Sequence, residues 1–299
     1  GKLCSKGSAL GETVGMGHRL TAPLVGGSET NWDGALQLVA DKFSQTVADH
    51  GSDAAAFYVS GQLLTEDYYV ANKLIKGFIG TANIDTNSRL CMASTVAGHK
   101  RAVGTDTVPG TYEDLDEADL VVLVGSNLAW CHPILHQRVL RAKDSRGTKL
   151  VVVDPRRTAS CDGADLHLPL APGSDVALFN HLLKAAIVRG VVDPAFLKNT
   201  NGFEAALKAA QADDVSVTGL SPADLEAFVD LWCGTKKVVT VFSQGVNQST
   251  SGADKVNAIL NCHLATGRIG TPGCGPLSVT GQPNAMGGRE VGGLANMLA

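Results

Sequence analysis

The stretch Asp119-Leu-Val-Val-Leu-Val-Gly-Ser-Asn127 decides the class of fold, because a run of mostly branched apolar residues passes directly into small and hydrogen-bonding ones. Lys149-Leu-Val-Val-Val-Asp-Pro-Arg156 and Val238-Val-Thr-Val-Phe-Ser-Gln-Gly-Val-Asn247 repeat this design. Strands that are apolar along their whole length are typical of a parallel sheet covered on both faces. Ligands bind beyond the carboxyl ends of such strands, so the three endings together predict a nucleotide or a similar ligand. Each ending alone is also compatible with ordinary turn chemistry.

Helical segments separate these strands, so the chain alternates between strand and helix and the predicted class is α/β. Ser174-Asp175 is predicted to cap a helix that runs to Arg189, where Gly190 follows. Ser221-Pro222 is predicted to open a further helix, with a capping serine and a proline at the first helical position.

The amino-terminal part is predicted to follow the same alternation. Helices are expected over residues 31–50 and 65–76, and a strand over residues 55–60. Residues 83–91 are polar, and we expect them to form a loop that carries Cys91 at its end.

The composition is that of a globular chain of about two domains, with 299 residues of which 44% are hydrophobic and 18% charged. The formal net charge is -4, so nucleic-acid binding is disfavoured. No apolar run reaches the roughly 18–20 residues of a membrane span, and no secretory signal opens the chain. Because the chain starts at Gly1 and ends in a helical-looking run, we expect both ends to be cuts through a longer protein.

Several common site patterns are missing from the sequence. Seven cysteines at wide spacings, without a Cys-x-x-Cys pair, do not make a disulfide framework, and most should pack as small hydrophobes. Simple NAD binding is disfavoured, because the nearest string to its glycine fingerprint, Gly15-Met-Gly17, follows no strand. The Gly-x-Ser-x-Gly elbow of a hydrolase is not present either.

Other strings resemble segments of one family, in order along nearly the whole chain. Leu3-Cys-Ser-Lys-Gly7 looks like the end of an iron–sulfur motif, and Thr86-Asn-Ser-Arg-Leu-Cys-Met92 looks like a metal-binding segment. Residues 125–127, 154–157, 172–175 and 281–290 look like cofactor-binding loops. Together these strings resemble the molybdopterin-guanine-dinucleotide oxidoreductases of the DMSO reductase type. Within that family the bacterial assimilatory nitrate reductases are the most similar, and these are related to the periplasmic nitrate reductases.

The resemblance implies a molybdenum ion held by two pterin cofactors, each with a guanine dinucleotide, and a [4Fe–4S] cluster that delivers electrons. The guanine dinucleotides would account for nucleotide-type strand endings without the NAD fingerprint. The implied cofactor contacts are Lys6, Gly125, Ser126, Asn127, Asp154, Arg156, Asp175, Gly245, Asn247 and Gln282. For Asp175 an equally physical role is to stabilise the start of its own helix.

Cys91 is the implied molybdenum ligand, and a soft thiolate suits such a metal. It follows Asn87, Ser88 and Arg89, which we expect to form an electropositive setting that favours the thiolate. On spacing alone, an inert buried cysteine is the alternative. By resemblance, Met92 distinguishes nitrate from formate as the substrate. The formate dehydrogenases of the family typically have a histidine at this position, whereas nitrate reduction needs no base beside the metal.

Arg289, Gln62 and Met286 resemble residues that line the substrate funnel. A guanidinium group matches the planar oxygens of nitrate, although a structural arginine that satisfies carbonyls is the alternative. Cys4 resembles the fourth ligand of the cluster, whose other three ligands would precede residue 1. Lys6 resembles the lysine between cluster and pterin, and a solvated surface charge is its alternative.

The resemblance divides the chain into a remnant of the cluster domain (1–22), a discontinuous α/β domain (23–86 plus 286–299) and a Rossmann-like cofactor domain (87–285). The predicted fold is therefore α/β, with parallel-sheet Rossmann-like domains of a multidomain molybdoenzyme truncated at both ends. The predicted function is cytoplasmic reduction of nitrate to nitrite for nitrate assimilation, with a flavoprotein, ferredoxin or flavodoxin as electron donor. The alternatives are a formate dehydrogenase of the same family and a non-catalytic nucleotide-binding α/β module.

Overall fold

The computed structural model describes residues 5–291, which fall into two compact units. The first comprises the described parts of the ranges 1–90 and 282–299, and the second comprises residues 91–281. The boundary falls inside helix α4 (Asn87–Val103). The finer division into domains 1–22, 23–86 plus 286–299, and 87–285 stays a prediction.

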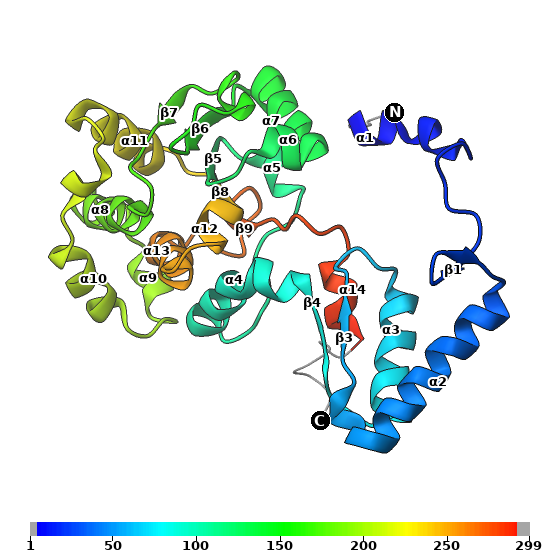
Figure 1. The fold of residues 1–299 in the computed structure, drawn as a ribbon. Helices are drawn as coiled ribbons and strands as arrows, with labels where there is room; N and C mark the ends of the chain where they lie inside the picture. Colours follow the sequence, from blue (N-terminus) through cyan, green and yellow to red (C-terminus); the bar gives the residue numbers. More distant parts are fainter. Residues whose placement is uncertain (1–4, 292–299) are drawn as a thin grey trace. The chain divides into compact units, whose positions relative to one another are not determined.

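The second unit is built on a five-stranded parallel sheet (Figure 1). Its strands follow the order β7-β6-β5-β8-β9. They are β5 (Leu120–Val124), β6 (Lys149–Val153), β7 (Leu166–Leu168), β8 (Val238–Phe242) and β9 (Gly275–Ser278). Val122 of β5 lies opposite Val151 of β6 and Thr240 of β8. The three strands expected from the apolar runs and the α/β class are therefore confirmed.

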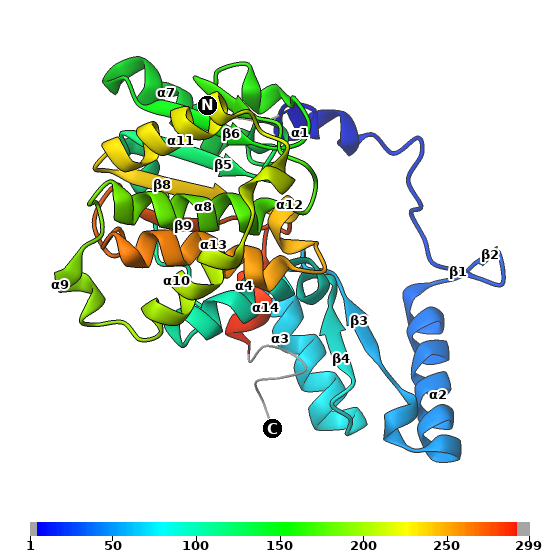
Figure 2. The ribbon, with the colours of Figure 1, turned by 90° about the vertical axis from the view of Figure 1, so that its left-hand side faces the viewer.

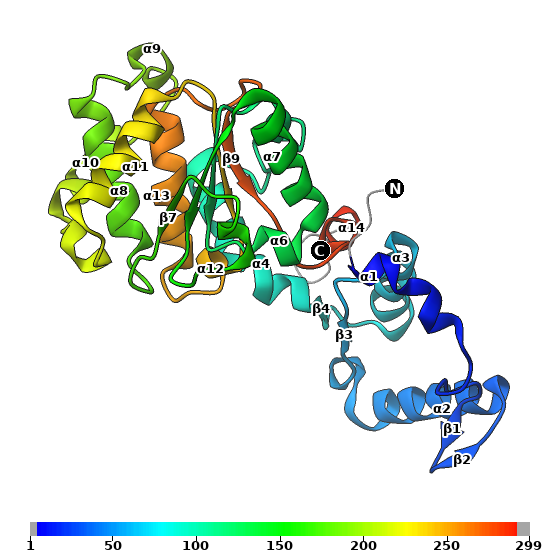
Figure 3. The ribbon, with the colours of Figure 1, turned by 90° about the horizontal axis from the view of Figure 1, so that it is seen from above.

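Alternate residues of the central strands supply two hydrophobic cores, one on each face of the sheet. Val122 and Val124 pack on the side of α8 (Asp175–Val188), α11 (Pro222–Gly234) and α13 (Gly252–Ala265). Val121 and Leu123 pack on the side of α5 (Asp114–Glu117) and α7 (Pro133–Arg146). Figure 2 shows α8, α11 and α13 over the strands, and Figure 3 shows α7 on the opposite side of the sheet. Both faces are covered, which explains why these strands are apolar at every position.

Shorter elements complete the second unit. They are α6 (Leu128–Cys131), η4 (Ala159–Cys161), α9 (Pro194–Leu197), α10 (Phe203–Ala212), η5 (Val215–Thr218) and α12 (Gln244–Asn247).

The first unit contains two parallel strands, β3 (Phe57–Val59) and β4 (Ile84–Thr86). Helix α3 (Thr65–Lys73) continues as the π-helical turn η3 (Leu74–Ile79), and Tyr68 packs with Ile75 and Ile84 in a small core. The other elements are α1 (Ser5–Ser8), η1 (Leu10–Val14), β1 (Leu24–Val25), β2 (Ser28–Glu29), α2 (Trp32–His50), η2 (Ser52–Ala54) and α14 (Ala285–Glu290).

Of the four predicted helix starts, three are right, and one predicted cap is wrong. Helix α3 begins at Thr65 as predicted. Asn31 caps α2, and Ser221 caps α11 ahead of a proline at the first helical position. Ser174 does not cap α8, because its hydroxyl donates to the carbonyl of Ala171 instead.

The predicted loop over residues 83–91 is wrong. Residues Ile84–Thr86 form β4, and Asn87 begins α4, so Cys91 lies on a helix. The polar residues that favoured a loop are those of a helix amino terminus, where polar side chains are also common. Among residues 5–291, no helix is both long and apolar enough to cross a membrane.

Candidate cofactor and substrate site

The carboxyl ends of β5 and β8 form the switch point of the five-stranded sheet. From β5 the chain continues outward through β6 and β7, and it then returns to place β8 on the other side of β5. The loops after β5 and β8 therefore leave in opposite directions, and open α/β sheets bind ligands in the crevice between such loops. The predicted contacts Gly125, Ser126, Asn127, Gly245 and Asn247 all follow these two strands.

Gly125 and Gly245 bring the two loops into backbone contact at this point. The backbone N–H of Gly245 donates to the carbonyl of Gly125 over 3.0 Å. A Cβ atom on Gly245 would lie 2.6 Å from the Gly125 Cα, and Gly125 has a φ of +53°, a left-handed conformation that favours glycine. A side chain at either position would push the loops apart.

Polar side chains line the strand ends next to this contact. The Ser126 hydroxyl is buried and has no hydrogen-bond partner among the described residues. The Asn127 Oδ1 accepts from the Ser160 hydroxyl over 3.2 Å. After β6, the buried Asp154 accepts from the backbone N–H of Arg156 over 2.9 Å, and the Arg156 side chain is exposed. A buried hydroxyl without a partner is costly, so a ligand that hydrogen-bonds to Ser126 would stabilise the site.

Cys91 lies on α4, and its side chain is only 5% exposed. The Nε2 of Gln244, the first residue of α12, donates to the Cys91 Sγ over 2.6 Å. One turn further along the same face of α4, the hydroxyl of Thr95 donates to Oδ1 of Asn247. The segment after β8 therefore contacts the helix face that carries Cys91.

Two further residues of α4, Met92 and His99, lie beside the end of β8 and the segment that follows it. The Nδ2 of Asn247 lies 3.4 Å from the Met92 Sδ. His99 is fully buried beside Phe242 at the end of β8, and burial lowers the pKa of its imidazole. A neutral imidazole is the form that this apolar setting favours.

Two charged residues predicted near the site have ion-pair partners in the structure. The Oδ2 of Asp175 pairs with Nζ of Lys255 at 2.7 Å, and its role as a cofactor contact stays a prediction. Arg89 forms an ion pair with Asp85 at 2.8 Å, so part of the positive charge expected ahead of Cys91 is balanced. Gln244 instead supplies the hydrogen-bond donor at the Cys91 sulfur.

In the first unit, the two segments that carry the predicted funnel residues, 61–63 and 282–289, lie next to each other although they are far apart in the sequence. Asn284 donates through Nδ2 to the carbonyl of Leu63 over 2.7 Å, and its backbone N–H donates to the carbonyl of Gly61. Residues 61–63, with the exposed Gln62, therefore lie beside the segment 282–289.

The described residues of that segment have different degrees of exposure. Gln282 packs so closely on Gly61 that a Cβ there would lie 2.7 Å from its Cγ. Met286 on α14 is 56% exposed, whereas Arg289 on the same helix is half-buried. Lys6 is exposed, and Cys4 lies outside the described residues.

The donor set of the second unit fits a molybdenum–pterin group. The sulfur of Cys91 is a soft ligand of the kind that thiol-binding transition metals prefer. The unpartnered hydroxyl of Ser126 and the contact of Gly125 with Gly245 offer polar groups and close backbone approach at the switch point. These residues could hold the group through one protein thiolate and hydrogen bonds from the loops after β5, β6 and β8.

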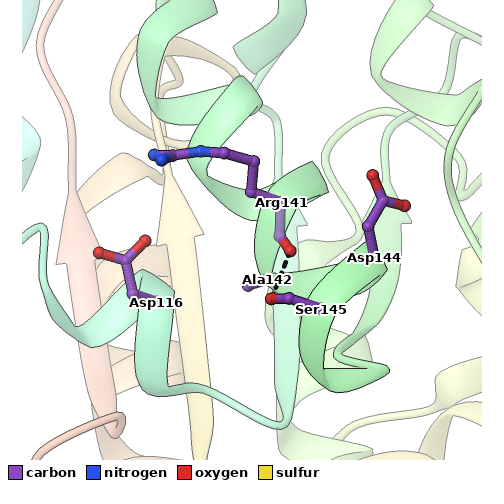
Figure 4. A pocket seen from close by; sticks show the side chains of 5 residues that line it. All are labelled: Asp116, Arg141, Ala142, Asp144 and Ser145. Atoms are coloured by element: carbon purple, nitrogen blue, oxygen red, sulfur yellow. Dashed lines mark hydrogen bonds between the residues drawn. The ribbon is translucent and has the colours of Figure 1, made fainter.

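A cavity in this unit does not belong to the site. A cavity of about 490 Å³ is lined by Asp116, Arg141, Ala142, Asp144 and Ser145 (Figure 4). These residues lie on α5 and near the end of α7, just before β5 and β6 begin. The cavity is therefore at the amino edge of the sheet, opposite the switch point.

The sequence interpretation missed Gln244, Ser243, Thr95 and Lys255. The signal for Gln244 is its place at the end of β8, directly before Gly245, where a polar side chain lies at the ligand-binding edge of the sheet. Thr95 and Lys255 lie inside helices, and no local pattern marks them as neighbours of the site.

Known proteins support the same fold and family. The chain matches the molybdopterin oxidoreductase family over residues 19–298. It is 55% identical over 304 residues to a nitrate reductase of Klebsiella oxytoca, covering 100% of this chain and 35% of that protein. It is 52% identical over 307 residues to a nitrate reductase of Shewanella frigidimarina, covering 100% of this chain and 33% of that protein.

The fold is similar to that of acetylene hydratase from Pelobacter acetylenicus, with a TM-score of 0.74 and 22% identity over 88% of this chain and 37% of that one. The chain thus spans about a third of the length of these relatives. The family match covers nearly all of the sequence, and the structure has a parallel sheet with a buried cysteine held beside its switch point. The chain belongs to the molybdopterin oxidoreductase family.

Proposed function

We propose that this chain is part of a molybdenum-dependent nitrate reductase, in which Cys91 is the protein's ligand to the metal. The observation that carries the proposal is the placement of Cys91. Its sulfur is buried on α4 and accepts a hydrogen bond from the segment that follows β8 at the switch point. The similarity to nitrate reductases and the methionine at position 92 favour nitrate over formate as the substrate.

The reaction consumes nitrate, two electrons and two protons, and it yields nitrite and water. A molybdenum ion held by pterin dithiolenes supplies the two-electron oxygen-atom transfer when it is bound. The chain holds that group through Cys91 and through its strand endings. The guanine dinucleotides of the cofactor would lie along Gly125, Ser126, Asn127, Asp154 and Gly245, where small and polar residues leave room for close backbone contact.

Selection of the anion is assigned to residues of the first unit. Arg289 offers a guanidinium group that can pair with two nitrate oxygens, and Gln62 and Met286 would shape the entrance. Met92 adds an apolar side chain directly after the metal ligand. None of these groups needs to take a proton from nitrate, which carries no hydrogen.

Electron delivery is proposed through a [4Fe–4S] cluster with Cys4 as one ligand and Lys6 between cluster and pterin. A flavoprotein, ferredoxin or flavodoxin would supply the electrons. The assimilatory type, and with it a place in the cytoplasm, is proposed from the resemblance of the motifs.

Nitrate-dependent oxidation of reduced viologen by the cofactor-loaded full-length protein tests the proposal, with nitrite measured as product. Cys91→Ala is expected to abolish turnover and to lower the molybdenum content. Cys233→Ala, which removes another buried free thiol, on α11, is the matched control and should turn over normally. Formate oxidation by a molybdenum-loaded protein that leaves nitrate untouched would transfer the assignment to formate and show that Met92 was misread.

A further inference from the structure

The amide of Gln244 has a defined direction toward the Cys91 sulfur. Its Nε2 lies 2.6 Å from the Cys91 Sγ, and its Oε1 accepts a hydrogen bond from the hydroxyl of Ser243. An amide has one accepting and one donating end, so the bond from Ser243 leaves the N–H end for the sulfur. A sulfur bound to a metal has lost its proton and can only accept, so this direction suits a ligated thiolate.

Ser243 is placed to set that direction. Its side chain is 6% exposed, and its hydroxyl lies between two acceptors, Oε1 of Gln244 and the carbonyl of Val279 at 3.1 Å. Only one hydrogen is available on the hydroxyl. When it points to Oε1, the Gln244 amide cannot turn over without losing that bond.

The backbone around Gln244 is held on both sides. Gly245 contacts Gly125 across the switch point, and the backbone N–H of Asn247 donates to the carbonyl of Ser243 over 3.0 Å. The side chain of Asn247 accepts from the hydroxyl of Thr95 on α4. The four-residue helix α12 is thus braced against both β5 and α4, so Gln244 approaches Cys91 from a fixed position.

We infer that Gln244 is a positioning residue for Cys91, which orients the thiolate and tunes the reduction potential of the metal through an N–H···S hydrogen bond whose direction Ser243 sets. The inference rests on the proposed ligation of molybdenum by Cys91. Hydrogen bonds to a metal-bound sulfur withdraw electron density from it and favour the reduced metal. Loss of the bond should therefore make the metal harder to reduce.

The test is an EPR-monitored redox titration of the Mo(V) signal in the cofactor-loaded full-length protein, without nitrate. Gln244→Met keeps the length and apolar stem of the side chain and removes the N–H donor. Its midpoint potential for Mo(V)/Mo(IV) is expected to shift to more negative values. Ser243→Ala, which leaves the amide in place but free to turn over, should shift it in the same direction by less. Gln248→Met is the matched control, because Gln248 is an exposed glutamine at the end of the same short helix.

A Gln244→Met protein with the potential and signal shape of the wild type would overturn the inference. If the variant folds with an unchanged thermal midpoint but loses molybdenum while Gln248→Met stays loaded, the result supports the same role for Gln244. Nitrate turnover is measured separately on the same samples. If the midpoint potential of Gln244→Met shifts but the wild-type protein does not reduce nitrate, the proposed substrate is contradicted and the positioning role of Gln244 is kept. An unchanged Mo(V) signal in Cys91→Ala would remove the proposed ligation itself and the inference with it.

Discussion

Asp175 on α8 and Lys255 on α13 form an ion pair with 2.7 Å between Oδ2 and Nζ, although only 9% and 4% of their side chains are exposed. Lys255 also donates to the carbonyl of Gly245 over 3.4 Å. The pair therefore joins two helices of one sheet face to the loop after β8, and that loop carries Gln244. The ion pair gives Asp175 a structural partner, which no local feature of the sequence indicated.

Lys255→Met is expected to lower the free energy of unfolding by about 3–5 kcal/mol, because it leaves a buried carboxylate without its ion-pair partner. Urea denaturation measures the change. The double variant Lys255→Met with Asp175→Leu should recover most of the loss, since no buried charge remains. Arg101→Met breaks the exposed pair with Asp254 and serves as control, with an expected loss of at most about 1 kcal/mol. If Lys255→Met and Arg101→Met lower the free energy of unfolding by the same amount, Asp175 is solvated and the prediction fails.

Gly245→Ala is expected to destabilise the protein by about 1–3 kcal/mol, because the new methyl group would lie 2.6 Å from the Gly125 Cα. Gly234→Ala is the matched control, since a Cβ at Gly234 meets no atom within 4 Å. That control should be neutral or slightly stabilising. The measurement is the urea midpoint at constant slope, and identical midpoints for the two variants would contradict the close approach.

His263 should make the stability sensitive to acid. Burial lowers the pKa of His263 to about 3, below its ordinary value of 6.5, and the nearby Arg268 contributes to this shift. The unfolded chain therefore binds a proton below pH 6.5 that the folded chain does not bind until about pH 3. Above pH 6.5 both states are neutral at this residue, and the free energy of unfolding is not affected by it. Between pH 6.5 and about pH 3, each pH unit of acidification lowers the free energy of unfolding by up to about 1.4 kcal/mol.

Thermal midpoints measured from pH 7 to pH 4 test this effect. His263→Leu should show a shallower decline than the wild type, even though the Thr240 hydroxyl loses its 2.8 Å bond to the ring. His18→Leu, at an exposed position, should decline as the wild type does. Parallel declines for His263→Leu and the wild type would assign the acid sensitivity to other groups.

Arg268→Lys is expected to cost about 1–3 kcal/mol of stability despite keeping the charge. The guanidinium lies 4.2 Å from the centre of the Trp232 ring, and it donates to the carbonyls of Trp232 and Thr235 over 3.1 and 2.5 Å. A lysine ammonium cannot stack in the same plane while it makes both bonds. Arg141→Lys, at an exposed position, should change stability by less than about 0.5 kcal/mol in the same denaturation experiment.

The parts of the fold that could be predicted are those with a local cause. The apolar runs before Gly125, Asp154 and Gly245 predicted three buried strands, because a strand covered on both faces needs apolar residues at every position. Ser221 before Pro222 predicted a helix start for an equally local reason. The loop expected over residues 83–91 failed because polar residues occur both in loops and at helix starts, and composition does not separate the two.

By itself, the sequence determined that this chain is an α/β protein with polar strand endings, and its motifs identified Cys91 and its neighbours as site candidates. Only the tertiary structure decided which residues meet. Gln244 contacts Cys91 across 153 positions, and Asp175 is paired with a lysine on another helix. The reason is physical: side-chain periodicity and capping act within a few residues, whereas contacts between distant segments depend on the strand order. That order places β8 beside β5, and no single segment of the sequence encodes it.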